Sequence, residues 1–157
     1  MELYRTKYFI VSTVEHPPHI SREEGGHIVI APITPIVDRT HLSPEQAIEC
    51  MRLTCIVGEA MTSGLARQGI FLGRINYQDN GNWGIGTPEG PHFHIHLYGR
   101  AVGATIQKFG EAPTFPRPST GFYDTFKPLT EGDCEEIRKD IDSLVLQEKY
   151  KDQAWGL

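Results

Sequence analysis

Residues 91–100 read Pro-His-Phe-His-Ile-His-Leu-Tyr-Gly-Arg, and in this stretch three histidines alternate with apolar residues. Successive side chains of a β-strand point to opposite faces, so a strand here places His92, His94 and His96 on one face and the apolar residues between them on the other. Each imidazole then lies about 7 Å from the next, because each pair is two strand steps of about 3.3 Å apart. The stretch predicts a row of groups that can attack, relay protons or bind an anion near neutral pH.

The strict alternation separates this row from the other histidines of the chain. An isolated histidine is usually solvated or has its hydrogen bonds satisfied, and that interpretation fits His16, His19 and His41. The polar face of an antiparallel strand more often carries Thr, Lys, Glu and Ser. We therefore interpret the three alternating histidines as a functional site.

Length and composition set the frame for such a site. A chain of 157 residues forms one domain and buries about two thirds of its unfolded surface. The net charge of −5 and the pI near 5.8 argue against a nucleic-acid surface, which needs an excess of Lys and Arg. Any phosphate group must therefore be bound locally.

The cysteines and the apolar runs indicate a cytoplasmic protein. Cys50, Cys55 and Cys134 are an odd number of thiols without the spacing of a metal site, which is typical of buried thiols in a reducing compartment. No apolar run approaches the roughly 18 residues of a membrane-spanning helix, and residues 1–5 lead into no signal-type segment. We expect no membrane partner.

Four strands are predicted from short apolar runs bounded by Gly, Pro and polar residues. They cover residues 8–14, 27–32, 70–76 and 91–100. The first two are expected to pair as a hairpin with a long turn. The third leads through a Gly-, Asn- and Pro-rich turn at 78–91 into the histidine strand, as in a meander.

Two helices are predicted between and after these strands. Ser43 is a strong N-cap, with Pro44 at the first helical position and Gln46 able to close a capping box. Apolar residues then recur at helical spacing until residues 63–64 weaken the pattern. A second helix is predicted over residues 130–150. Strands with two separated helices favour a single α+β domain, residues 1–157, with an antiparallel meander sheet.

The segment between the histidine strand and the second helix has no sustained period. Residues 103–128 are rich in Gly, Pro, Thr and Phe, and the segment is too long for an ordinary connection. Segments of this kind are either disordered or functional. Its aromatic residues could stack on a base, or could pin the loop to the domain or to a second subunit.

The pattern His-apolar-His-apolar-His-apolar-apolar resembles the signature of the histidine triad (HIT) family of nucleotide hydrolases and transferases. Upstream, His-Ile-Val-Ile-Ala-Pro from residue 27 looks like the family's Gly-His-apolar-strand-Pro segment, and Leu-Ser-Pro-Glu-Gln from residue 42 looks like the start of its first helix. The matches run from about Gly26 to Arg100, roughly half of the chain. The resemblance implies a meander sheet with helices, commonly paired as a homodimer.

The resemblance also implies a reaction. His94 would attack the α-phosphorus of a nucleotide, form a covalent nucleotidyl-histidine and pass the nucleotide to water or another acceptor. His92 and His96 would supply hydrogen-bond donors, because charge builds on the phosphoryl oxygens in the transition state. The expected substrate is a nucleoside polyphosphate, a phosphoramidate or a similar nucleotide, and no cofactor is expected.

The same resemblance implies residues that bind the substrate. His27 matches the upstream histidine that supports the triad from a neighbouring strand. Asn76 lies where the family usually has an asparagine that contacts the phosphates, although its distance to the triad leaves Asn80 or Asn82 open. Glu15 is the nearest candidate for the acidic residue that binds the ribose.

The chain departs from the family just before the triad. Many members carry Gly-Gln-Ser/Thr-Val there, and the hydroxyl helps to protonate the leaving group, whereas residues 87–91 here read Thr-Pro-Glu-Gly-Pro. Thr87 could supply a hydroxyl from a shifted turn. Glu89 could act as a general acid if it were buried enough to raise its pKa, or it could simply be a solvated turn residue.

Two other kinds of function stay open at this point. Alternating histidines on a strand can also bind Zn²⁺ or another divalent ion from one face. The changed residues before the triad instead favour a nucleotide-binding protein with little turnover.

Overall fold

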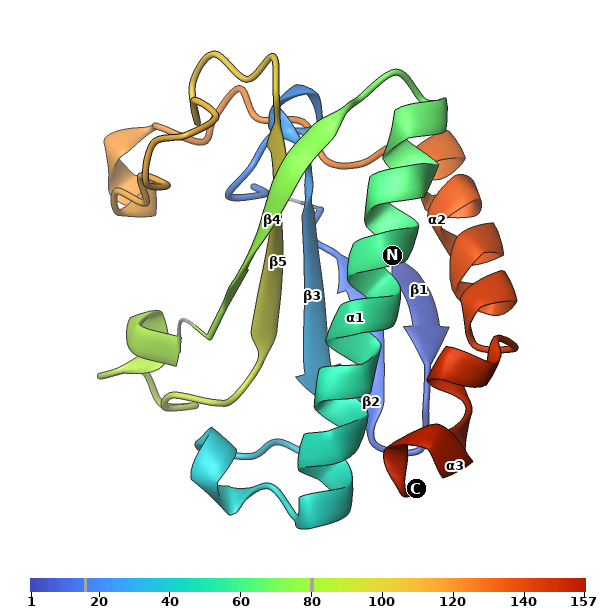
Figure 1. Ribbon diagram of the computed structural model, residues 1–157. Helices are drawn as coiled ribbons and strands as arrows, with labels where there is room; N and C mark the ends of the chain where they lie inside the picture. The colour runs from blue at the N-terminus through green and yellow to red at the C-terminus, as the bar shows by residue number, and fades with distance from the viewer. Residues whose placement is uncertain (16, 80) are drawn as a thin grey trace.

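A five-stranded antiparallel sheet forms the centre of the structure, a computed structural model that describes residues 1–15, 17–79 and 81–157. Its strands lie in the order β1-β2-β3-β5-β4 (Figure 1). The strands are β1 (Glu2–Arg5), β2 (Phe9–Thr13), β3 (His27–Pro32), β4 (Leu72–Gln78) and β5 (Ile95–Ala101). The predicted α+β class with an antiparallel sheet is confirmed.

The strand order departs from a strict meander at one place. A meander would put β4 beside β3, but β5 lies between them and pairs with both. The burial of the two strands explains the exchange, because β5 is buried along its whole length whereas several residues of β4 are exposed. The more apolar strand occupies the interior of the sheet and the more polar strand its edge.

The strand at the other edge, β1, was not predicted. It has four residues, and only Leu3 among them is buried, so it carries no readable alternation. The hairpin of β2 with β3 is confirmed, as is the start of β3 at His27.

The two main helices are α1 (Pro44–Arg67) and α2 (Glu131–Leu144). The predicted capping box of α1 is present: Ser43 Oγ accepts from the N–H of Gln46, and Gln46 Oε1 accepts from the N–H of Ser43. The helix continues past Gly64, since this residue allows close packing. A Cβ at Gly64 would lie 3.0 Å from the side chain of Ile137 in α2.

The predicted helix over residues 130–150 is too long. After Leu144 the chain turns into the short helices η5 (Glu148–Tyr150) and α3 (Asp152–Trp155). Tyr150 is fully buried, and its hydroxyl donates to Glu59 of α1 at 2.7 Å. The contact of Tyr150 with α1 therefore explains why α2 ends at Leu144 and does not continue to residue 150. The remaining 3₁₀ turns are η1 (Arg22–Glu24), η2 (Arg39–His41), η3 (Gly81–Gly84) and η4 (Pro118–Thr120).

Both main helices cover one face of the sheet, and the long loops gather on the other (Figure 1). Phe93, Ile95 and Leu97 face the helices and belong to the core, as the alternation predicts. In the described ranges, neither α1 nor any other helix combines the length and the apolar character of a membrane span.

The predicted aperiodic segment 103–128 is held to the sheet by two buried charged residues. The carboxylate of Glu24 accepts hydrogen bonds from the backbone N–H groups of Thr105, Ile106 and Gln107, at 2.7 to 2.9 Å. The guanidinium of Arg100 donates to the carbonyl oxygens of residues 107, 108 and 111, at 2.7 to 3.2 Å. The start of this loop therefore has a fixed position.

We expect Glu24→Ala to lower the free energy of unfolding by about 2 kcal/mol or more, because it leaves backbone donors unpaired. Glu23→Ala is the matched control, since Glu23 is exposed and its loss should change stability by about 0.5 kcal/mol or less. Urea denaturation measures both, and hydrogen exchange should report faster exchange at residues 105–107 in Glu24→Ala alone. Equal effects of the two substitutions would show that the carboxylate of Glu24 does not hold the loop.

Candidate functional site

The three alternating histidines form a row that runs from solvent into the protein. Strand β5 begins at Ile95, so His92 and His94 lie on the segment that leads into it, and a hydrogen bond of 2.6 Å from Phe93 N–H to the carbonyl of Ile36 fixes this segment. The ring centroids lie 4.9 Å apart for His92 and His94, and 4.5 Å apart for His94 and His96. His92 is exposed, His94 is half-buried and His96 is buried. We call these residues the histidine row.

The hydrogen bond of His94 determines which of its nitrogens is reactive. Its Nδ1 lies 2.9 Å from the carbonyl oxygen of His92. A carbonyl oxygen only accepts, so Nδ1 carries the proton and donates it. In the neutral ring the lone pair is then on Nε2. His94 thus presents an unprotonated nitrogen from a half-buried position.

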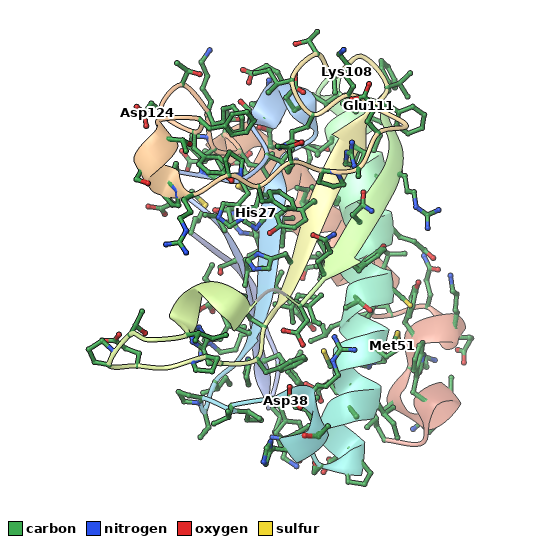
Figure 2. The ribbon with its side chains drawn as sticks, turned by 90° about the vertical axis from the view of Figure 1, so that its left-hand side faces the viewer. His27, Asp38, Met51, Lys108, Glu111 and Asp124 are labelled. Carbon is green, nitrogen blue, oxygen red and sulfur yellow. The ribbon has the colours of Figure 1, made fainter. Side chains whose placement is uncertain are left out.

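The inner end of the row is hydrogen-bonded to the neighbouring strand. His27 of β3 is 2% exposed, and its Nε2 lies 2.8 Å from Nδ1 of His96. Nδ1 of His27 accepts the backbone N–H of His19 at 3.2 Å. The proton of neutral His27 is therefore on Nε2 and is donated to His96, whose own proton must then be on Nε2. Figure 2 shows His27 in the middle of the sheet, on the side where the loops lie.

Burial keeps the rings of His27, His94 and His96 neutral at pH 7. It lowers the pKa of His96 to about 3, with further contributions from His94 and His19, and it lowers the pKa of His27 well below its usual range. Burial and the nearby His92 also lower the pKa of His94, although the hydrogen bond to the carbonyl of His92 and the charge of Asp79 act in the opposite direction. The chemistry available here is that of neutral imidazoles.

His19 lies among these rings, although its sequence context did not single it out. Its ring stacks on that of His27 at a centroid distance of 5.0 Å, and its Nδ1 shares a hydrogen bond of 3.0 Å with the hydroxyl of Tyr98. The backbones of residues 25 and 99 also approach closely, since a Cβ on Gly99 would lie 2.0 Å from the carbonyl oxygen of Gly25. No local pattern marks such a long-range contact.

His19, His27 and His96 could in principle share a metal ion, since each offers a ring nitrogen and these atoms lie within 4.8 Å of one another. In the described ranges, the ring nitrogens of this trio are close enough to share a metal ion, and those of the histidine row are not identified as such a group. A histidine that binds a metal donates its other N–H to an acceptor. A metal on Nε2 of His27 would put the proton on Nδ1, facing the N–H of His19. The hydrogen bonds present engage both nitrogens of His27, so this arrangement favours a hydrogen-bonded chain over a metal bound through Nε2 of His27.

Strand β4 places Asn76 and Gln78 on the same face as the row. Asn76 lies opposite Tyr98, and its Oδ1 accepts from Nη1 of Arg100 at 3.1 Å. Gln78 lies opposite His96 and was not predicted as a site residue. The sequence feature that could have identified Gln78 is its place as a polar residue at the end of a predicted strand next to the histidine row. The alternative Asn80, together with the side chain of Asn82, lies outside the described part of the chain.

The remaining predicted residues lie nearer the surface. The carboxylate of Glu15, beyond the end of β2, accepts from the N-terminal ammonium at 2.7 Å. The hydroxyl of Thr87 donates to the carbonyl of Gly84 at 3.0 Å and accepts the N–H of Gly90 at 3.2 Å, so it stabilises its own turn. Glu89 is exposed in that turn, which fits a solvated turn residue.

Comparisons with known proteins identify this arrangement of strands and helices. No family model matches the sequence, and a search of curated proteins finds no match. Among solved structures, a hypothetical histidine triad nucleotide-binding protein from Sulfolobus tokodaii has a TM-score of 0.59 over 92% of this chain and 85% of its own, at 14% identity. A Zn-bound histidine triad family protein from Mycobacterium smegmatis has a TM-score of 0.56 over 91% and 84%, at 21% identity.

A further histidine triad protein, from Bradyrhizobium japonicum, has a TM-score of 0.58 over 90% of each chain, at 16% identity. All of these alignments cover most of both chains, so the likeness concerns the whole domain and not only the histidine segment. At such low sequence identities, the structural likeness establishes the fold alone. The chain has the fold of the histidine triad proteins.

Proposed function

We propose that this protein is a nucleotide phosphohydrolase or nucleotidyltransferase that acts at the α-phosphorus through a covalent intermediate on His94. One observation carries the proposal. The Nδ1 proton of His94 is donated to the carbonyl of His92, which leaves the Nε2 lone pair available from a half-buried ring. Covalent catalysis by histidine requires this combination of a fixed tautomer and an accessible nitrogen.

The reaction follows in two steps. Nε2 of His94 attacks the α-phosphorus, the bond to the leaving group breaks, and its electron pair departs with that group. The ring becomes cationic, and the carbonyl of His92 stabilises the charge through the Nδ1 hydrogen bond. Water or the hydroxyl of another acceptor then attacks the phosphorus and releases its proton to solvent, and the electron pair of the N–P bond returns to His94.

The neighbours of His94 contribute hydrogen-bond donors. The Nε2–H of His96 follows from the chain through His27 and can donate to a non-bridging phosphoryl oxygen. His92, exposed at the outer end of the row, can contact the leaving group. Asn76 and Glu15 stay predictions as contacts to phosphate and ribose.

The surroundings of Thr87 and Glu89 bear on the leaving group. The hydroxyl of Thr87 is engaged within its turn, and Glu89 is exposed. Both observations support leaving groups that depart readily without a strong acid, such as a phosphate chain. They also fit the second candidate, a nucleotide-binding protein with little turnover. The experiment on His94 described below tests both candidates.

The loop 103–128 is a candidate determinant of substrate choice. Tyr123 and Phe126 are buried and therefore pin the loop to the domain. Phe115 and Phe122 are only partly buried, and Phe115 lies beside His19 at a centroid distance of 5.8 Å. Contact of the loop with a base or a leaving group would come from these partly buried rings.

The free thiols support a cytoplasmic location. Cys50, Cys55 and Cys134 form no disulfide, and burial raises the pKa of Cys50 to about 11 and also raises that of Cys134. Thiols of this kind are unreactive and persist in a reducing compartment.

We expect His94→Ala to abolish both turnover and adduct formation while the protein stays folded, since it removes the nucleophile from a half-buried position. The measurement is intact mass after brief exposure to a panel of nucleoside polyphosphates, phosphoramidates and related nucleotides. The wild type should gain the mass of one nucleotidyl group. Exposed His41→Ala is the matched control and should keep the adduct. Tight nucleotide binding by the wild type without any adduct would favour the second candidate.

The pH dependence of the rate should follow the lowered pKa of His94. Protonation of Nε2 removes the lone pair, so kcat/KM should be constant near neutrality and fall as the pH drops below the ordinary histidine pKa of about 6.5. Initial rates between pH 5 and pH 8.5 measure this. A rate that rises steadily from pH 7 to pH 5 would rule out a neutral histidine nucleophile.

We also propose that two chains pair along β4. This strand is at the edge of the sheet, and Tyr77 on it is 49% exposed. Met51 lies on helix α1 (Figure 2) and is 60% exposed. A groove of about 570 Å³ with mostly apolar walls lies between them. Edge strands with exposed apolar residues are ready for pairing.

Light scattering after gel filtration should therefore give twice the chain mass of 17.6 kDa. Met51→Glu should shift the protein toward the monomer, whereas Leu146→Glu, at a residue that is 75% exposed beyond α2, should not. A wild-type protein of single-chain mass at high concentration would contradict the pairing.

A further inference from the structure

A second layer of side chains lies behind the catalytic histidines. Tyr98 of β5 is fully buried and lies opposite His27 across the β3–β5 pair. Its ring stacks on that of His96, with centroids 5.1 Å apart and an interplanar angle of 9°. Its hydroxyl shares the 3.0 Å hydrogen bond with His19. One tyrosine thus contacts the inner histidine of the row and the residue that contacts His27.

We propose that His19 and Tyr98 are positioning residues that set the tautomers of His27 and His96. The backbone N–H of His19 selects the tautomer of His27, and Tyr98 holds His19 where that N–H can act. The catalytic consequence rests on the function proposed above, whereas the tautomers themselves are a property of the folded protein.

The backbone N–H of His19 is what determines the direction of the chain. A backbone N–H can only donate, so Nδ1 of His27 must be the acceptor. Reversal would put a proton on Nδ1 of His27 and set two N–H groups against each other. The His19 N–H therefore fixes two tautomers in sequence, first that of His27 and then that of His96.

The surroundings leave water little access to His27 and Tyr98. His27 is 2% exposed and Tyr98 is fully buried. Phe115 and Tyr123, both from the loop, cover this end of the cluster, with centroids 4.7 Å from Tyr98 and 5.4 Å from His19 respectively. In such an environment a hydrogen bond that is lost is not recovered from solvent, so its direction is enforced strongly.

The tautomer of His96 matters because, in the proposed reaction, its Nε2 is the atom that contacts the substrate. As Nε2–H it donates to a phosphoryl oxygen, and as a bare nitrogen it would repel that oxygen. Loss of the His19 contact should therefore affect kcat more than KM, since the phosphoryl charge is greatest in the transition state. The nucleophile His94 keeps its own hydrogen bond to the carbonyl of His92.

The decisive measurement is the ¹⁵N chemical shifts of the histidine ring nitrogens in the ligand-free wild type at pH 7.5. We expect His27 and His96 to carry their protons on Nε2 and His94 to carry its proton on Nδ1. A proton on Nδ1 of His27 would overturn the proposal, whatever activity the protein has.

Two variants test whether Tyr98 and His19 fix the tautomer of His27. Tyr98→Phe removes one hydroxyl and keeps the ring, and His19→Ala removes the partner of that hydroxyl; each should give mixed tautomers at His27 and lower kcat about tenfold, the effect of one hydrogen bond, with KM little changed. Tyr123→Phe is the matched control, because its hydroxyl donates to the carbonyl of Pro116 and not to a histidine. It should keep the wild-type tautomers and kcat.

The outcomes separate the two proposals. Wild-type tautomers and kcat in both Tyr98→Phe and His19→Ala would overturn the positioning role. If the wild type shows the expected tautomers, and these change in the two variants, but no nucleotidyl adduct forms with any nucleotide, the positioning role stands and the covalent mechanism fails.

Discussion

The hydrogen bond between His27 and His96 is the constraint on which the rest of the structure depends. It joins two buried imidazoles across adjacent strands at 2.8 Å, so β3 and β5 must be neighbours in a fixed register. Because the more polar β4 takes the edge of the sheet, β5 then lies between β3 and β4. The long helix α1 makes that possible, because it carries the chain from β3 past the position that β5 later fills.

A buried polar pair is costly unless every polar atom has a partner, and here the partners form one continuous chain. The hydrogen bonds run from the backbone N–H of His19 to His27 and from His27 to His96. The three imidazole rings lie beside Tyr98, which the loop residue Phe115 covers. Keeping the rings neutral avoids the larger cost of a buried charge. The same neutrality is what a nucleophilic imidazole needs, so the requirements for stability and for chemistry coincide.

The sequence predicts most of what depends on local pattern. The alternation at residues 92–96 predicts the polar row and the core face behind it, and the Ser43 capping box predicts where α1 begins. Among contacts between distant segments, the place of His27 beside the row was expected only from the resemblance to a family, and others were missed. The position of β5 in the sheet, the early end of α2 and the place of His19 all depend on burial against residues far away in the chain. No spacing within one segment encodes such contacts.

The attachment of the loop after β5 has a consequence for variation in sequence. Glu24 holds three consecutive peptide N–H groups, and Arg100 holds three peptide carbonyls of the same segment. Both residues therefore recognise the backbone, which is common to nearly all amino acids. Most side chains between residues 105 and 111 are free to differ without loss of the loop's path. A library randomised there would sample new chemistry on an unchanged scaffold if it kept Glu24, Arg100, the buried Gln107 and Gly110, whose φ of 92° favours glycine.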